Sequence, residues 1–155
     1  MILIVTTEKS GIDRYSQELG KRIREKKTET RRYLSLEESY RFFRLVKGLD
    51  DIIHFPNQHG GRYALFLRKP FLITVHDLAR LRFGFTKETL RERIGLKLDV
   101  MGIKRASHII AVSKYTEKDL IKYLNKSEET NSLCHSSIDH SIFKPTETKL
   151  FDFPY

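Results

Sequence analysis

Residues 71–81 read FLITVHDLARL, and this stretch decides the fold. FLITV is a short apolar run rich in β-branched residues, and such a run is typical of a strand buried on both faces in a parallel sheet. It ends at His76 and Asp77, two polar residues at the carboxyl end of the predicted strand. Because ligands of open α/β sheets bind beyond the carboxyl ends of the strands, this point is a candidate site. Two other interpretations stay open, since Asp77 can cap the next turn and His76 can be a core histidine.

Strand-like and helix-like segments alternate around this stretch. We expect strands at residues 2–6, 30–36, 51–55, 71–75, 108–112 and 132–136, with 30–36 at an edge because it is polar. We expect helices at residues 13–27, 37–46, 86–106 and 116–124, and a helical turn at 64–68. The helix at 86–106 carries apolar residues on two faces, which predicts that it is well buried. The alternation predicts a Rossmann-like, doubly wound parallel α/β sheet with right-handed crossovers.

The composition suits one globular domain with a core of its own. The chain has 155 residues, of which 39% are hydrophobic and 32% are charged. No apolar run approaches the roughly 20 residues that a membrane-spanning helix needs. The N-terminus has no basic leader before its apolar run, so we expect a first strand there and not a signal peptide. A single cysteine, Cys134, favours a reducing cytoplasm.

Positive charge is concentrated in one part of the chain. The net charge is +9, and residues 61–110 alone hold 11 Lys and Arg against 4 Asp and Glu. A basic patch attracts the phosphates of nucleic acids, nucleotides or anionic lipid headgroups. A solvated basic face without a ligand is the plainer alternative.

The sequence lacks the patterns of several common kinds of site. Gly11 opens a predicted helix, where backbone N–H groups favour a phosphate, but the loop before it has neither the GxGxxG nor the Walker pattern, which excludes an NAD site and a P-loop. The histidines His54, His59 and His76 do not have the spacing of a zinc motif, so we expect no metal. Ser113 lacks a nucleophile-elbow sequence, which argues against acyl transfer.

Five segments, taken together, resemble the N-terminal half of a retaining glycosyltransferase of family 4 (glycosyl transferases group 1). These are GIDRYSQELGKRI, DIIHFPN, FLITVHDL, ASHIIAVSKYTEKDLIKYL and SSIDHSIFKP, in that order along the chain. They are similar to the family's first helix, third strand, VxxxHDL strand, ADxIIAVSxxTxxDL element and interdomain link. The chain departs from the family at Ser10-Gly11, where paired glycines are usual, and at Ser136-Ser137, where Asn-Gly is usual.

The resemblance implies one half of a two-domain GT-B enzyme. Residues 1–145 would be the acceptor-side domain, and residues 146–155 a linker toward an absent C-terminal donor domain. The whole enzyme would transfer a sugar from a nucleotide-sugar donor to a hydroxyl group of a glycan or lipid-linked acceptor, with retention and without a metal or other cofactor. The chain alone would then be inactive.

The resemblance also implies roles for single residues. His76 would lie beside the reacting sugar and orient it through a hydrogen bond. Gly11 and Ile12 would border the donor phosphates. The acceptor-side residues would be Asn57, Asp77, Arg80 and Ser113.

Two further expectations concern partners. Arg80, Arg82, Phe83 and Phe85 would form a loop that docks peripherally on an anionic membrane at the cytoplasmic face. The alternatives are a stand-alone nucleotide- or phosphate-binding Rossmann-like module and a basic nucleic-acid-binding protein. Against nucleic acid, no helix-turn-helix or RNA-binding signature occurs in the sequence.

Overall fold

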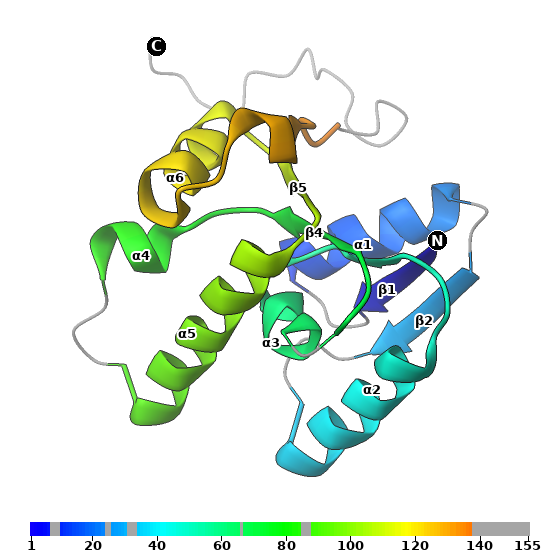
Figure 1. The fold of residues 1–155 in the computed structure, drawn as a ribbon. Coiled ribbons are helices and arrows are strands. Elements are labelled where there is room, and N and C mark those ends of the chain that lie inside the picture. Colours follow the sequence, from blue (N-terminus) through cyan, green and yellow to red (C-terminus); the bar gives the residue numbers. More distant parts are fainter. Residues whose placement is uncertain (7–9, 24–25, 31–33, 66, 85–87, 138–155) are drawn as a thin grey trace, which may run out of the picture.

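The computed structural model describes residues 1–6, 10–23, 26–30, 34–65, 67–84 and 88–137 (Figure 1). Its centre is a six-stranded, all-parallel sheet with the strand order β2-β1-β3-β4-β5-β6. The strands are β1 (Ile2–Thr6), β2 (Lys26–Thr30), β3 (Ile53–Phe55), β4 (Phe71–Val75), β5 (His108–Ala111) and β6 (Asn131–Leu133). The order reverses after β2, as in a doubly wound α/β sheet, so the predicted fold class is confirmed.

The helices are α1 (Gly11–Arg22), α2 (Leu36–Gly48), α3 (Gly61–Ala64), α4 (Ala79–Phe83), α5 (Leu90–Arg105) and α6 (Lys114–Leu124), with 3-10 turns η1 (Gln58–Gly60) and η2 (Glu128–Thr130). The longer helices α1, α2, α5 and α6 begin at residues with capping side chains, whereas the short α3 and α4 do not. Ser10, Ser35 and Thr89 each form a capping box with the acidic residue three positions later. Each box satisfies backbone N–H groups that the first helical turn leaves without an intrahelical partner.

The helices cover the two faces of the sheet unequally. Because the first crossover runs in the opposite direction to all later ones, right-handed connections put α1 on one face and α2, α3, α5 and α6 on the other. The core on the second face includes Phe55 and Phe71, whose rings meet edge to face at 6.1 Å, and the fully buried Ile73 and Ile109. The strand predicted at 71–75 therefore forms the centre of the molecule.

The helix α5 packs very closely against α3. An added Cβ at Gly102 would lie 2.0 Å from the carbonyl oxygen of Gly61, and one at Gly61 would lie 2.5 Å from the carbonyl oxygen of Asp99. Only glycine fits at these two positions, so the two backbones are in direct contact.

The structure corrects four predicted elements. The second strand lies at 26–30 and not at 30–36, because KKTET has no apolar pattern and is defined by its pairing with β1. The first helix, α1, ends at Arg22 and not at residue 27. The helical turn expected at 64–68 lies at Gly61–Ala64. Residues 80–83, part of the loop expected at 80–85, belong to α4.

The expected deep burial of the long helix is also wrong. Leu90, Ile94 and Met101 of α5 are 74%, 50% and 51% exposed, whereas Asp99, Gly102 and Ile103 are buried. The close approach to α3 requires small residues, and this turns the Gly102 side of the helix inward.

Some predictions fall outside the described residues. These are the loop residues 7–9, Phe85, most of the SSIDHSIFKP link and the linker at 146–155. Among the helices of the described ranges, none is both long and apolar enough to cross a membrane.

Candidate functional site

His76 lies just beyond the carboxyl end of β4, where three other elements reach it. Its Nε2 is 3.0 Å from the carbonyl oxygen of Pro56, in the turn after β3, and its backbone N–H donates to Oε1 of Gln58 at 3.2 Å. The ring of Tyr15, from α1, meets the imidazole edge to face at 4.9 Å. The hydroxyl of Thr116, in the first turn of α6, donates to the backbone carbonyl of His76 at 2.9 Å.

These contacts decide the protonation of His76. A carbonyl oxygen can only accept, so Nε2 carries the proton that faces Pro56. Burial lowers the pKa of His76, opposed by that hydrogen bond and by the nearby carboxylates of Asp77 and Asp13. At neutral pH the ring is therefore a neutral imidazole held in one orientation.

The N-terminus of α1 lies close to this histidine. The first intrahelical hydrogen bond runs from the N–H of Arg14 to the carbonyl of Ser10, so the amides of Gly11 and Ile12 precede the hydrogen-bond ladder. An added Cβ at Gly11 would meet nothing within 4 Å, so the approach to this point is open. Tyr15, one turn later, contacts His76, and this places the helix start at the same sheet edge. The arrangement suits an anion, and the assignment of Gly11 and Ile12 to the donor phosphates stays a prediction.

Asp77 and Ser113 both accept hydrogen bonds from backbone N–H groups near the starts of helices. Oγ of Ser113, the N-cap of α6, accepts from the N–H of Thr116 at 3.1 Å. Oδ1 of Asp77 accepts from the N–H of Ala79 at 3.1 Å and so closes the turn before α4, whose N-cap is Leu78. Asp77 is exposed and Ser113 is half-buried, so a ligand can reach both side chains. The acceptor roles of the two residues stay predictions.

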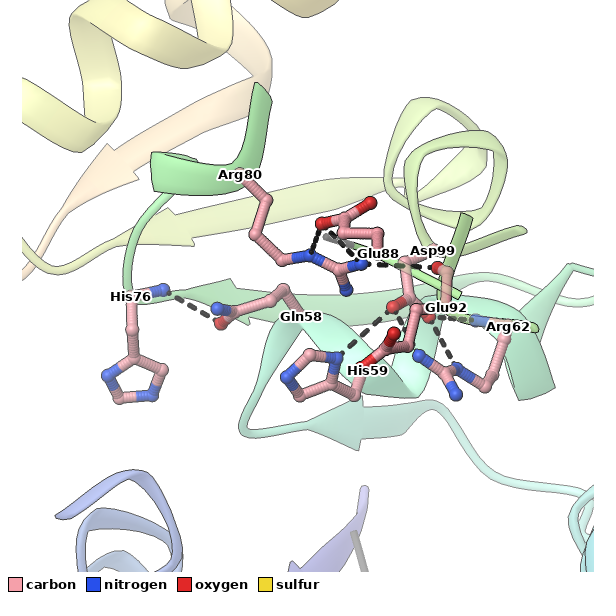
Figure 2. A network of polar contacts seen from close by, with 8 residues as sticks. All are labelled: Gln58, His59, Arg62, His76, Arg80, Glu88, Glu92 and Asp99. Carbon is pink, nitrogen blue, oxygen red and sulfur yellow. Dashed lines mark hydrogen bonds and ion pairs between the residues drawn. The ribbon is translucent and has the colours of Figure 1, made fainter. Parts of the chain in front are cut away.

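The side chains of Asn57 and Arg80 are less accessible to a ligand than those of Asp77 and Ser113. Asn57 is only 4% exposed, so its side chain faces the interior and contacts with an acceptor would require the turn after β3 to move. Arg80 donates from Nε to Glu88 at 2.8 Å and from Nη2 to the carbonyl of Glu92 at 3.2 Å (Figure 2). Arg80 therefore links α4 to the start of α5, and its acceptor role stays a prediction.

One polar cluster beside the site was not predicted from the sequence. Asp99 of α5, 3% exposed, accepts from Nε and Nη2 of Arg62 at 2.8 and 2.6 Å and contacts Nδ1 of His59 at 3.1 Å (Figure 2). The backbone N–H of Arg62 also donates to this carboxylate, at 3.3 Å. Asp99 thereby fixes η1 and α3, the segment that follows Pro56, onto the long helix.

A small cavity lies between this cluster and the start of α4. Its volume is about 30 Å³, and Gln58, His59, Asp77, Arg80 and Asp99 are among its lining residues. Within the described residues, no group of three or more His, Cys, Asp or Glu side chains is placed to hold a metal ion. The expectation that no metal is needed stays a prediction.

A second buried histidine lies below the site. Nε2 of His54 is 2.9 Å from Oγ1 of Thr74, and both side chains are buried between the sheet and α1. Burial lowers the pKa of His54 to about 4, so this ring is neutral at physiological pH. Its contacts are those of a core residue.

Comparisons with known proteins agree with the fold. The family model described as Glycosyltransferase Family 4 matches residues 3–141, a span that includes the described strands and helices except for Ile2, the first residue of β1. A comparison with curated proteins gives no match. Because the family match covers most of the chain, this protein belongs to glycosyltransferase family 4.

Proposed function

We propose that the chain is the acceptor-side, N-terminal domain of a retaining glycosyltransferase. It takes part in transferring a sugar from a nucleotide-sugar donor to a hydroxyl group of a glycan or lipid-linked acceptor. The observation that carries the proposal is the convergence on His76 of the turn after β3, the first turns of α1 and the start of α6. This places an oriented imidazole at the sheet edge where α/β proteins bind ligands, and membership of the family supplies the type of reaction.

The donor phosphates bind at the start of α1. The amides of Gly11 and Ile12 and the positive end of the helix dipole stabilise the negative charge that develops on the leaving diphosphate. This stabilisation makes a metal ion unnecessary. His76 contacts the transferred sugar, and Asp77 and Ser113 border the acceptor, with Asn57 and Arg80 behind them.

Most of the donor site belongs to a second domain of the GT-B enzyme. The described residues offer the nucleotide only the helix start, and in GT-B enzymes the second domain holds the nucleotide. With the donor site divided in this way, these 155 residues alone should not catalyse the transfer.

The first experiment is an intact-mass measurement of the protein in its native cells. A mass above 18.3 kDa identifies the longer polypeptide as the enzyme to assay, and a mass equal to that of this chain directs the search to a partner protein. The completed enzyme is then tested with a panel of nucleotide sugars, and the anomeric configuration of the product is read by NMR.

His76→Ala is the decisive variant in that assay. It should lower the transfer rate at least about tenfold, the effect of losing a net hydrogen bond of about 1.4 kcal/mol in the transition state. His108→Ala is the matched control, because His108 bonds Ser132 on the far side of the sheet and should keep the parental rate. Full activity of His76→Ala, or an inverted product, would contradict the proposal.

We also propose that an anionic membrane is a peripheral partner of the domain. Three exposed apolar side chains form a stripe along the outward face of α5: Leu90, Ile94 and Met101. Exposed cations on the same helix, Arg93, Lys97 and Lys104, flank this stripe. On α4, Phe83 is 73% exposed beneath the guanidinium of Arg82. An apolar stripe bordered by cations is the pattern of a helix that lies in the interface of an anionic bilayer.

Vesicle co-sedimentation tests this contact. The protein should bind vesicles that contain phosphatidylglycerol and not vesicles of phosphatidylcholine alone. The double variant Leu90→Ser, Ile94→Ser should lose the binding. The matched control is Leu36→Ser, Tyr40→Ser in α2, whose side chains are 88% and 62% exposed without contributing to the stripe. Equal binding to both kinds of vesicle would refute the proposal.

A further inference from the structure

The turn after β3 holds His76 at two separate points. The carbonyl of Pro56 accepts from the imidazole at 3.0 Å, and the side chain of Gln58 accepts from the backbone N–H of the same histidine at 3.2 Å (Figure 2 shows the second contact). Both acceptors belong to one short segment. The orientation of His76 therefore depends on how firmly that segment is held.

The segment is held from below by α5. Asp99 is buried, and its carboxylate binds Arg62 through two guanidinium nitrogens and contacts His59, so it ties both η1 and α3 to the helix. The backbone contact between Gly61 and Gly102 sets the distance between the two elements. Asp99, which follows His76 by 23 positions in the sequence, thus holds in place the turn that orients His76.

We propose that Gln58 and the Asp99–Arg62 ion pair are positioning residues that lock His76 as its Nε2–H tautomer. Pro56 uses the one proton of the neutral ring, and Nδ1 has no hydrogen-bond partner among the residues that the structure describes. Nδ1 is then left as a hydrogen-bond acceptor. The group that meets it is a hydrogen-bond donor such as a sugar hydroxyl, and not a carbonyl or phosphate oxygen; this last step alone rests on the proposed function.

The test is a long-range ¹H–¹⁵N NMR spectrum of the chain labelled with ¹⁵N-histidine, recorded at about pH 8, where a histidine with an unperturbed pKa of about 6.5 is already neutral. The pattern of couplings reports which ring nitrogen carries the proton, and His76→Gln assigns the His76 signals among the six histidines. The parent chain should show His76 as the Nε2–H form. An Nδ1–H form would overturn the proposal. The measurement needs no donor or acceptor, so it stands whether or not transfer is ever observed.

Two variants test the positioning residues. Asp99→Asn and Gln58→Leu should each lower the ratio of Nε2–H to Nδ1–H about tenfold, the effect of weakening one hydrogen bond to Pro56. Gln58→Glu keeps an acceptor oxygen for the backbone N–H and should restore the parental ratio. If Asp99→Asn does not fold, the comparison of Gln58→Leu with Gln58→Glu alone tests whether Gln58 sets the tautomer of His76.

The matched control is Arg105→Gln. Arg105 also joins α5 to the α3 region, through the carbonyl of Leu67 at 3.2 Å, but it does not touch the turn after β3. It should lower stability and leave the His76 tautomer unchanged. The proposal would be overturned if folded Asp99→Asn and Gln58→Leu kept the parental tautomer ratio. It would also be overturned if Arg105→Gln changed the ratio as much as they do, because the cluster would then act only through general packing.

Discussion

At the scale of single residues, the buried side chain of His54 makes the free energy of unfolding depend on pH in the acid range. Its pKa is lowered by burial from 6.5 to about 4, so the unfolded chain binds a proton that the folded chain does not between these pH values. Stability from this group is complete above pH 6.5 and declines as the pH falls toward 4. We predict a loss of about 3 kcal/mol in the free energy of unfolding over this window, measured by urea denaturation.

His54→Gln is the variant that isolates this effect. The amide keeps a partner for Thr74 but does not titrate, so the decline between pH 6.5 and 4 should be smaller by about 3 kcal/mol than in the parent chain. His76, whose pKa burial also lowers, contributes in the same direction and remains in both proteins. Identical pH profiles for the two proteins would show that His54 is not the source.

The sequence predicts single residues well only where a local pattern carries the information. His76 follows an apolar run directly, and this placed it at a strand end. Asp99 gave no such signal, because an acidic residue on a helix ordinarily faces water. Its partners His59 and Arg62 are 40 and 37 positions away, and only the packing of α3 on α5 brings them together.

At the scale of elements, the contact between α3 and α5 depends on Gly102. We predict that Gly102→Ala lowers the free energy of unfolding by about 3 kcal/mol, because the new Cβ meets a backbone oxygen at 2.0 Å that no side-chain rotation can move. Gly48→Ala in α2 is the control. Its Cβ would meet nothing within 4 Å, and the higher helix propensity of alanine should raise stability by up to about 1 kcal/mol. A Gly102→Ala protein as stable as the parent would mean that the two helices can separate at little cost.

The elements also show why some predictions failed. FLITV was located correctly because a doubly buried strand is apolar throughout. KKTET has no such pattern, and its strand forms because β1 offers a free edge to pair with. The long helix was located correctly, but its apolar pattern predicted burial of two faces and only one is buried. The Ile103 face packs inward, whereas Leu90 and Ile94 are exposed, because the close backbone approach at Gly102 determines the packing.

At the scale of the whole molecule, the excess of positive charge distinguishes between two kinds of partner. Cations alone bind any polyanion, and such binding weakens steeply with salt because it is driven by the release of counterions. A membrane also takes up the apolar stripe of α5, a contribution that salt does not screen.

We therefore predict that raising the salt from about 50 mM to about 200 mM abolishes binding to an arbitrary single-stranded oligonucleotide and only weakens binding to anionic vesicles. The variant Leu90→Ser, Ile94→Ser should lose vesicle binding and keep the parental affinity for the oligonucleotide at low salt. Oligonucleotide binding that persists at the higher salt, or that falls with the apolar variant, would favour a nucleic-acid partner for this face over a membrane.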